Sequence, residues 1–433
     1  MKNIHIIKLV ILLITLNFLY SCSSDTCDYD PDPTGSTCNV SPNNTEKSGF
    51  SVCTQYNSDP NGFVGQIVNT QMNSTFNTAE DLNPTITAAS GVIKPTNWTP
   101  NDIGQIFGIA IDDNENIYLA ASTVYTMAGY VTSITNARPA QVYKCSPPNY
   151  NAVALYTLPN SGTGALNGIG NIAYDKINQQ LFTTNLEDGK IYRHSLTGAL
   201  LGSIDPWTAD DGTVGTAPQD ERIWGIGVNY EGVLVKIYFP RITSSGTREI
   251  YSITLQNDGS FPTASNPETL EINNVPGNQL AITDIAFSSD TNKMLLAERG
   301  AAHQSKIMSY NKTGSTWSTN LTYYVGGFAA GENSAGGVDF AYEERGGDIN
   351  ANCDEFFWGT GNYMYARNSG GRIYGMEGIK YSGNNKESAT APTANQDTDF
   401  FFDFNGTLGT QDKGFIGDVE VFDCNECFDI CIN

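Results

Sequence analysis

Residues 282–310 read ITDIAFSSDTNKMLLAERGAAHQSKIMSY. This stretch contains three short runs rich in apolar residues, at 282–287, 293–297 and 305–310. The segment between the first two runs, 288–292, consists mainly of Ser, Asp and Asn, which favour turns because their side chains bond to nearby backbone groups. Apolar runs of this length bounded by turn residues are typical of β-strands. The stretch therefore predicts three consecutive strands.

The same pattern recurs along the chain. The first strand recurs at 108–112, 170–174, 224–228, 284–287 and 338–341. The second recurs at 116–119, 180–183, 233–238, 293–296 and 355–358. The third recurs at 142–143, 191–192, 250–251, 307–308 and 373–374, and a fourth, outer strand at 152–158, 199–204, 268–272, 321–325 and 400–404. Four strands per unit, with a period of roughly 40–60 residues, predict the blades of a β-propeller.

A sixth first strand lies at residues 416–422, and no partner strands follow it. The missing partners are expected near the other end of the chain, at 50–55, 64–69 and 85–88. We therefore predict an all-β, six-bladed β-propeller in which the last blade is closed by N- and C-terminal strands, which removes an open sheet edge. Seven blades would require further strands within the long loops of the first blade. A β-sandwich would not give this four-part recurrence.

Residues 108–118, GIAIDDNENIY, resemble the blade phrases of two propeller groups. These are the six-bladed gluconolactonase and senescence-marker-like proteins, which form the calcium-dependent phosphotriesterase superfamily, and the NHL-repeat proteins. The resemblance covers about residues 100 to 425. It implies the propeller architecture, and in that superfamily a calcium ion at the channel mouth polarises a lactone or ester.

Residues 1–21 have the features of a signal peptide: Lys2 and Lys8 precede or flank a short apolar run at 9–16. The run is short for a span of about 30 Å of hydrocarbon. The sequence LYSC at 19–22 resembles a bacterial lipobox, which implies cleavage before Cys22 and acylation of that residue. An ordinary signal peptide and a transmembrane anchor are the alternatives.

Residues 22–48 are rich in Pro, Ser, Thr, Asn and Asp and predict a flexible tether. The acidic segment SSDTCDYD at 23–30 resembles the surface-export signal of Bacteroidota lipoproteins. That resemblance implies an outer-membrane lipoprotein displayed on the cell surface, whereas a merely solvated acidic tether is the alternative. Residues 49–433 then form one propeller domain with a Cys-rich C-terminal tail.

The chain is acidic, with 23 basic and 46 acidic residues and a net charge of −23. Removal of Lys2 and Lys8 with the signal peptide makes the balance 21 minus 46, or −25. Such a protein is repelled by phosphate backbones, so we do not expect it to bind nucleic acid.

Eight cysteines remain besides Cys22, and an even number in an exported chain favours disulfides. One expected pair, Cys53 with Cys424, would tie the composite blade together. Zinc binding by the CxxC at 424–427 is the alternative, but only two histidines remain after the signal peptide. The disulfide candidates are Cys27, Cys38, Cys53, Cys424, Cys427 and Cys431.

First strands of a propeller begin near one face, where the loops between second and third strands also gather. Oxygen ligands converging on that mouth are what Ca²⁺ requires. The candidate metal ligands are Asn171, Asp284, Asp339 and Asp418, and the candidate mouth residues are Asn185, Glu298, Arg299 and His303. Alternatively, Asp284 and Asp418 bond to the backbone of neighbouring blades.

The sequence contains no Gly-x-Ser-x-Gly and no His-Glu-x-x-His motif. We therefore expect a non-catalytic interaction subunit that binds an outer-membrane protein in transport, secretion or barrel assembly. A calcium-dependent lactonase-like hydrolase is the second hypothesis. Glycan binding is the third, and it requires exposed aromatic platforms; the candidates are Trp98, Trp207 and Trp317.

Overall fold

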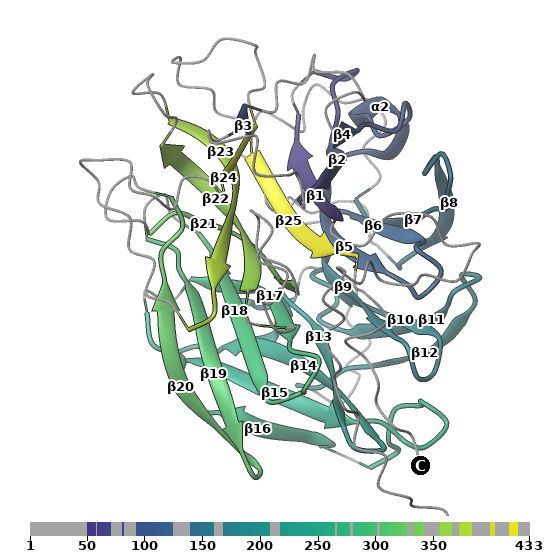
Figure 1. Ribbon diagram of the computed structural model, residues 1–433. Coiled ribbons are helices and arrows are strands. Elements are labelled where there is room, and N and C mark those ends of the chain that lie inside the picture. Colours follow the sequence, from purple (N-terminus) through teal and green to yellow (C-terminus); the bar gives the residue numbers. More distant parts are fainter. Residues whose placement is uncertain are drawn as a thin grey trace, which may run out of the picture. The chain divides into compact units, whose positions relative to one another are not determined.

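Six β-sheets form the blades of a β-propeller (Figure 1). The computed structural model describes residues 50–57, 59–70, 80–81, 92–123, 139–159, 168–207, 217–264, 266–277, 280–300, 304–326, 332–341, 354, 356–365, 372–382, 399–402 and 415–422. All of them belong to one unit, Val40–Asn433. The predicted all-β, six-bladed architecture is confirmed.

Five blades follow one another along the chain. Blade 1 consists of β5 (Ile106–Ile111), β6 (Ile117–Ala121), β7 (Gln141–Cys145) and β8 (Ala152–Thr157). Blade 2 consists of β9 (Ile169–Asp175), β10 (Gln180–Asn185), β11 (Ile191–Ser195) and β12 (Leu200–Ile204). Blade 3 consists of β13 (Gly227–Glu231), β14 (Leu234–Ile242), β15 (Arg248–Thr254) and β16 (Glu268–Ile272).

Blade 4 consists of β17 (Ala281–Phe287), β18 (Lys293–Arg299), β19 (Ile307–Thr313) and β20 (Thr316–Tyr323). Blade 5 consists of β21 (Ser334–Ala341), β22 (Phe356–Tyr365), β23 (Arg372–Lys380) and β24 (Asp399–Phe402). Among the described residues, the helical elements are α2 (Pro100–Ile103) and a 3₁₀ turn at Gln219–Glu221. No helix in this part of the chain is long and apolar enough to cross a membrane.

Blade 6 joins the two ends of the chain, as predicted. Its inner strand is β25 (Phe415–Val421), followed by β1 (Phe50–Tyr56), β2 (Gly65–Asn69) and β4 (Val92–Ile93). The yellow β25 lies beside the purple β1 in Figure 1, with Ser51 opposite Val421 in the antiparallel register. The expected outer strand at 85–88 falls outside the described residues, and β4 occupies the outer position instead.

Two predicted strand boundaries differ from the structure. The inner strand of blade 3 was expected at 224–228 but begins at Gly227, where its ladder with β14 starts. The outer strand of blade 4 was expected at 321–325 but spans Thr316–Tyr323. A tight turn pairs Thr313 with Thr316 there, so the ladder starts earlier.

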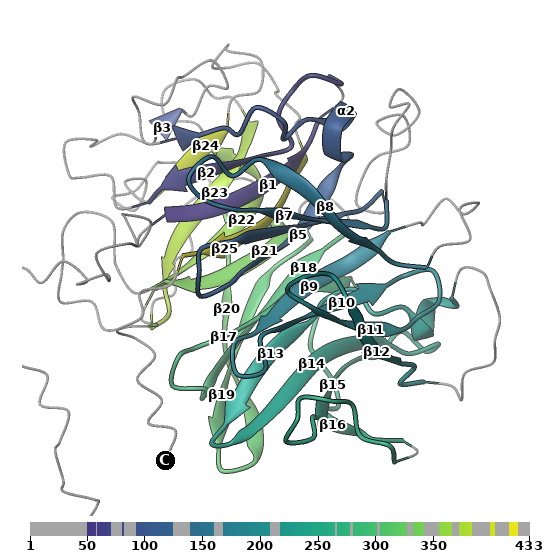
Figure 2. The same cartoon turned by 90° about the vertical axis from the view of Figure 1, so that its right-hand side faces the viewer.

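The outer edges of the blades are protected in three ways. The outer strands β8, β12, β16 and β20 each contain an extra residue relative to their partners, which is a β-bulge. The outer strand β24 has no bulge and is covered by β3 (Glu80–Asp81), which pairs with it in parallel (Figure 2). The outer strand β4 has only two residues. Bulges, covering and short length all discourage pairing with another chain.

Turns between first and second strands lie on one face, which we call the turn face. Neighbouring blades touch through these turns: the Tyr174 hydroxyl donates to Asp113 at 2.8 Å, and the Lys176 amide donates to the Tyr230 hydroxyl at 2.9 Å. Because adjacent strands are antiparallel, turns between third and fourth strands lie on this face as well. The opposite face, where inner strands begin, is the mouth face.

Inner strands also carry bulges, and these lie in the central channel. The register against the second strand shifts by extra inner-strand residues in blades 1, 2, 4, 5 and 6. A bulge leaves amides without a ladder partner. In three blades a second-strand threonine accepts the freed amide at 2.8–2.9 Å; the pairs are Thr54 with Asp418, Thr184 with Asn171, and Thr360 with Gly337.

Two of these threonines also connect neighbouring blades. The Thr54 hydroxyl donates to the carbonyl of Phe107 in blade 1 at 2.7 Å, and the Thr360 hydroxyl donates to the carbonyl of Gly417 in blade 6 at 2.8 Å. Thr54 is fully buried. The Thr54 hydroxyl, in the blade that closes the ring, therefore satisfies a backbone amide of blade 6 and a backbone carbonyl of blade 1.

The substitution Thr54→Val should lower the free energy of unfolding by about 1–3 kcal/mol, because it leaves a buried amide and a buried carbonyl without partners. The measurement is chemical unfolding followed by tryptophan fluorescence. The matched control is Thr316→Val, which makes the same change on the exposed strand β20. Equal losses in the two variants would contradict the role of Thr54.

Candidate functional site in the central channel

The inner strands alternate between glycine and an amide or carboxyl side chain where they approach the channel axis. Blades 1, 3 and 5 place Gly108, Gly225 and Gly337 there, while blades 2, 4 and 6 place Asn171, Asp284 and Asp418. A Cβ on Gly108 would overlap Oδ1 of Asn171, and one on Gly337 would lie 2.7 Å from Oδ1 of Asp418. Gly108 and Gly337 therefore make room for the polar side chains of adjacent blades, whereas Gly225 lets the backbone of residues 282–284 approach closely.

Asp284 accepts three hydrogen bonds and is nearly buried. Its Oδ1 accepts from the Ile285 amide at 2.9 Å and from Nδ2 of Asn171 at 3.1 Å. Its Oδ2 accepts from the Val338 amide of blade 5 at 2.8 Å. The carboxylate thus caps the bulge of its own strand and the inner strand of the next blade.

Asp418 has the same role two blades further around the ring. Its Oδ1 accepts from the Val419 amide at 3.0 Å, and its Oδ2 accepts from the Ile109 amide of blade 1 at 3.2 Å. The carboxyl groups of Asp284 and Asp418 also affect each other's ionisation.

Burial raises the pKa of Asp284 to about 7. Burial also raises the pKa of Asp418 well above its usual value, and the charge of Asp284 adds to this shift. Two carboxyl groups in one buried site cannot both ionise readily, because each charge opposes the other. The pair therefore retains a proton near neutral pH.

Asn171 completes the cluster with an amide in place of a third carboxyl group. Its Oδ1 accepts from the Ile172 amide at 2.7 Å, and its Nδ2 donates to the Thr283 carbonyl at 2.9 Å as well as to Asp284. We call Asn171, Asp284 and Asp418 the channel plug. The structure thus brings together three of the four predicted metal ligands.

The fourth predicted ligand, Asp339, is directed elsewhere. Its carboxylate accepts from the Phe340 amide at 2.8 Å and from the Val421 amide at 2.8 Å, which ties β21 to β25. Among the described residues, no group of three or more His, Cys, Asp or Glu side chains could hold a metal ion. Calcium binding stays a prediction, and the plug oxygens that would serve it already accept backbone amides.

Arg299 extends from the end of β18 over the mouth of the channel. Its guanidinium donates to the carbonyl of Ala335 in blade 5 and, at 2.8 Å, to the carbonyl of Ile416 in blade 6. The rings of Tyr56 and Phe107 lie 6.0 and 5.5 Å from its guanidinium carbon. One cation therefore contacts blades 5, 6 and 1 from blade 4, and it lies where the sequence placed it, at the mouth.

Glu298 lies next to Arg299 and is fully buried in an ion pair with Arg248. Its Oε2 accepts from the Lys306 amide at 2.8 Å. Burial raises the pKa of Glu298, although the Arg248 guanidinium opposes the shift. Arg248 was not predicted, because nothing in its sequence context distinguishes a buried arginine from an exposed one.

Of the other two predicted mouth residues, Asn185 and His303, the structure describes only Asn185. Asn185 is buried and shapes its own loop: its Nδ2 donates to the Pro159 carbonyl at 2.8 Å, and its Oδ1 accepts from the Glu187 amide at 3.0 Å. His303 lies outside the described residues. Sequence analysis also missed the second-strand threonines, although Thr54, Thr184 and Thr360 occupy equivalent positions in the repeat and could have been found by aligning it.

The tryptophans considered as exposed platforms are mostly enclosed. Trp98 is fully buried and donates to the Tyr150 carbonyl at 2.8 Å, and Trp317 is 6 % exposed. Trp207 is partly buried and packs against Tyr251 and under the guanidinium of Arg241, 4.6 Å from the ring centroid. These side chains do not form a shared flat platform.

Cys53 is a free, buried thiol whose Sγ donates to the Thr54 carbonyl at 3.6 Å. This differs from the expected Cys53–Cys424 disulfide: Cys53 faces the packed interior of the composite blade beside Asp418. The remaining disulfide candidates, Cys27, Cys38, Cys424, Cys427 and Cys431, and the lipidation candidate Cys22 lie outside the described residues.

The chain is similar in structure to several solved propellers. A putative 6-phosphogluconolactonase from Bacteroides uniformis is 11% identical, with a TM-score of 0.43, over 79% of this chain and 81% of that protein. A gluconolactonase from Xanthomonas campestris is 10% identical, with a TM-score of 0.39, over 77% and 85%. A calcium-binding regucalcin from Agrobacterium tumefaciens is 10% identical, with a TM-score of 0.38, over 64% and 72%.

The structural neighbours are thus gluconolactonase- and regucalcin-like propellers, in agreement with the resemblance seen in the sequence. At this level of similarity they carry no argument about the activity of this chain. No protein-family model matches the chain, and no curated protein matches it.

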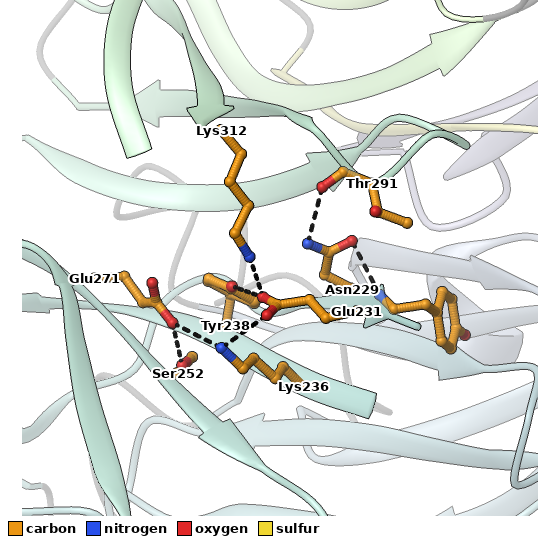
Figure 3. Close-up of polar contacts among 9 residues, drawn as sticks. Asn229, Glu231, Lys236, Tyr238, Ser252, Glu271, Thr291 and Lys312 are labelled. Atoms are coloured by element: carbon orange, nitrogen blue, oxygen red, sulfur yellow. Dashed lines mark hydrogen bonds and ion pairs between the residues drawn. The ribbon is translucent and has the colours of Figure 1, made fainter. Parts of the chain in front are cut away.

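A second polar network lies at the turn face between blades 3 and 4 (Figure 3). The Oε1 of Glu231 accepts from the Tyr238 hydroxyl at 2.8 Å and from Nζ of Lys312. Its Oε2 lies 3.1 Å from Nζ of Lys236, which also lies 3.4 Å from Oε1 of Glu271. Because Lys312 belongs to β19 and the others to blade 3, Glu231 joins two blades.

The substitution Asn171→Asp should lower stability at pH 7 by about 3 kcal/mol or more, because it adds a third carboxyl group to the buried plug. Thermal unfolding measures the effect. The matched control is Asn229→Asp on the inner strand of blade 3, where Nδ2 donates to the Thr291 carbonyl at 3.3 Å, away from the plug. A smaller loss for Asn171→Asp than for the control would contradict the charge argument.

The substitution Glu231→Gln should lower stability at pH 7 and have less effect near pH 3. Burial opposes ionisation of Glu231, but hydrogen bonds from Lys312, Tyr238 and Lys236 outweigh it, so its pKa lies below the usual value. A lowered pKa contributes stability above the unfolded-state pKa that is lost as the pH falls through the folded-state value. Unfolding free energies at several pH values test this, and a pH-independent difference would refute it.

Proposed function

We propose that this chain is a surface-exposed outer-membrane lipoprotein and a non-catalytic interaction subunit of an outer-membrane complex in transport, secretion or barrel assembly. The proposal rests on the hydrogen bonds that the polar groups of the channel make. The carboxyl oxygens of Asp284 and Asp418 accept backbone amides from neighbouring blades. Arg299 extends over the mouth and donates to two inner-strand carbonyls. These polar groups of the channel thus hold neighbouring blades together.

The lipid anchor in this proposal comes from the sequence. The segment LYSC at 19–22 places Cys22 where a lipobox cysteine is acylated, and the acidic segment at 23–30 supports export to the cell surface. A rigid ring of blades presents many loops at fixed relative positions, which suits protein recognition. The net charge of −23 disfavours nucleic acid as a partner.

A calcium-dependent hydrolase is the second candidate, and one observation favours it. Asn171, Asp284 and Asp418 do converge on the channel, and oxygen ligands of this kind suit Ca²⁺. This function requires Ca²⁺ to displace backbone amides from the carboxylates. Glycan binding, the remaining alternative, has less support, because Trp98 and Trp317 are buried.

Purification from the native membrane tests the proposal. A C-terminal tag on the chain, extraction in mild detergent and mass spectrometry should yield a stoichiometric outer-membrane protein, together with an acylated N-terminal Cys22. The variant Cys22→Ser should leave the membrane fraction and lose the partner, because it has no acceptor for acyl chains. Recovery of the chain alone in its acylated form would contradict the subunit role.

Calcium titration separates the two candidates. The interaction subunit predicts an unchanged melting temperature in millimolar Ca²⁺ and no lactone hydrolysis. The hydrolase predicts a rise in melting temperature for the natural chain that is lost in Asp284→Asn, with lactone hydrolysis lost in parallel. The control Asp339→Asn should retain any calcium response, because Asp339 bonds to β25 outside the plug.

A further inference from the structure

Exposed large aliphatic side chains occur among the described residues of blades 1, 2 and 3. Val233 is 76 % exposed, Val153 is 65 % exposed and Leu200 is 60 % exposed. The others are Ile177, Leu201, Leu234 and Leu270. Single exposed aliphatic residues are common, but several of them on one face of neighbouring blades are typical of an interaction surface.

Six of these side chains lie at the turn face. Ile177 is in the turn between β9 and β10, Val233 is in the turn between β13 and β14, and Leu234 is the first residue of β14. Val153, Leu200 and Leu201 belong to the first two residues of β8 and β12 (Figure 2), which start from turns on that face. We call these six side chains the aliphatic rim.

Contacts between neighbouring turns support this placement. In blade 1 the turn before β8 touches the turn after β5, since the Tyr150 hydroxyl lies 3.5 Å from Oε2 of Glu115. Gly198, in the turn before β12, lies against Leu155 of β8. The rim residues of blades 1 and 2 therefore lie next to each other.

The described chain begins on the same face. Phe50 starts β1, the second strand of its blade, and second strands run from the turn face to the mouth face. Phe50 packs in the cluster that also contains Ile111, at the end of β5, and Ala152, at the start of β8. The 28 residues from Cys22 to residue 49 thus join the propeller at the face that carries the rim.

We propose that the aliphatic rim of blades 1–3 rests on a lipid bilayer, with its side chains in the boundary between headgroups and acyl chains. This inference rests on the proposed acylation of Cys22. A 28-residue segment can extend to about 90 Å, so the anchor alone imposes no orientation. It does hold the propeller at a high effective concentration beside the membrane, where weak apolar contacts suffice to orient it.

The charge of the chain predicts which kind of lipid the rim prefers. The whole chain carries −23, which opposes an anionic surface. Near the rim, Lys144 and Lys176 are offset by Asp113 and Glu115. Contact must therefore come mainly from the aliphatic side chains, and zwitterionic lipid should serve better than anionic lipid.

Photocrosslinking tests the inference. The acylated chain, purified from its membrane, is reconstituted into phosphatidylcholine vesicles that contain a phosphatidylcholine with a diazirine in its acyl chain. Mass spectrometry after illumination should place adducts at 177, 200–201 and 233–234. The variant Val233→Ser with Leu234→Ser should reduce the adducts at Ile177 at least threefold, because the propeller loses its orientation. Val233 is in a turn and Leu234 starts β14, and both are exposed, so folding is preserved and is checked by thermal unfolding.

The matched control is Val233→Ile with Leu234→Met, which keeps the turn apolar and should keep the adducts. Replacing 30% of the lipid by phosphatidylglycerol should lower the yield of adducts at the rim. Adducts spread evenly over both faces, or none at the rim of the acylated chain, would overturn the inference and leave the proposed function standing. An N-terminal peptide without acyl groups would instead refute the lipid anchor. A dimer in size-exclusion chromatography that Val233→Ser with Leu234→Ser dissociates would assign the rim to a second copy and overturn the inference.

Discussion

The structure depends on how the inner strands satisfy their backbone amides inside the channel. Each bulge brings a strand closer to the axis but frees amides that water cannot reach. Asp284 and Asp418 each accept one amide from their own strand and one from the next blade. The ring is thus closed by hydrogen bonds between blades in addition to apolar packing, and removing one carboxyl group would leave two blades with unsatisfied amides.

The same constraint explains the alternation around the ring. Gly108 and Gly337 provide the space that the side chains of Asn171 and Asp418 occupy, and Gly225 lets the backbone of residues 282–284 approach closely. Asn171 donates where a third carboxyl group would only accept, which keeps the buried charge low. Arg299 then joins blades 5, 6 and 1 at the mouth. The polar groups of the channel therefore stabilise the ring of blades.

At the surface, the outer edges are bulged, covered or short, which disfavours strand addition by another chain. The aliphatic rim is an exposed apolar group among the described residues, and it shares its face with the start of the described chain at Phe50. Anchor and rim together would present the mouth face away from the membrane. The loops between second and third strands lie on that face, so a protein partner would find them accessible.

The repeat in the sequence by itself determined the fold class, the number of blades and the closure by both ends, because strand periodicity and turn residues are local signals. It also identified Asp284, Asp418 and Arg299 as channel residues from their places in the repeat. Only the tertiary structure decided their partners. Asp339 resembles Asp284 in sequence but bonds to β25, Cys53 is a free thiol, and Glu298 pairs with an arginine 50 residues away. Burial and hydrogen bonding between blades depend on which strands become neighbours in the ring, and this is not encoded in any single segment.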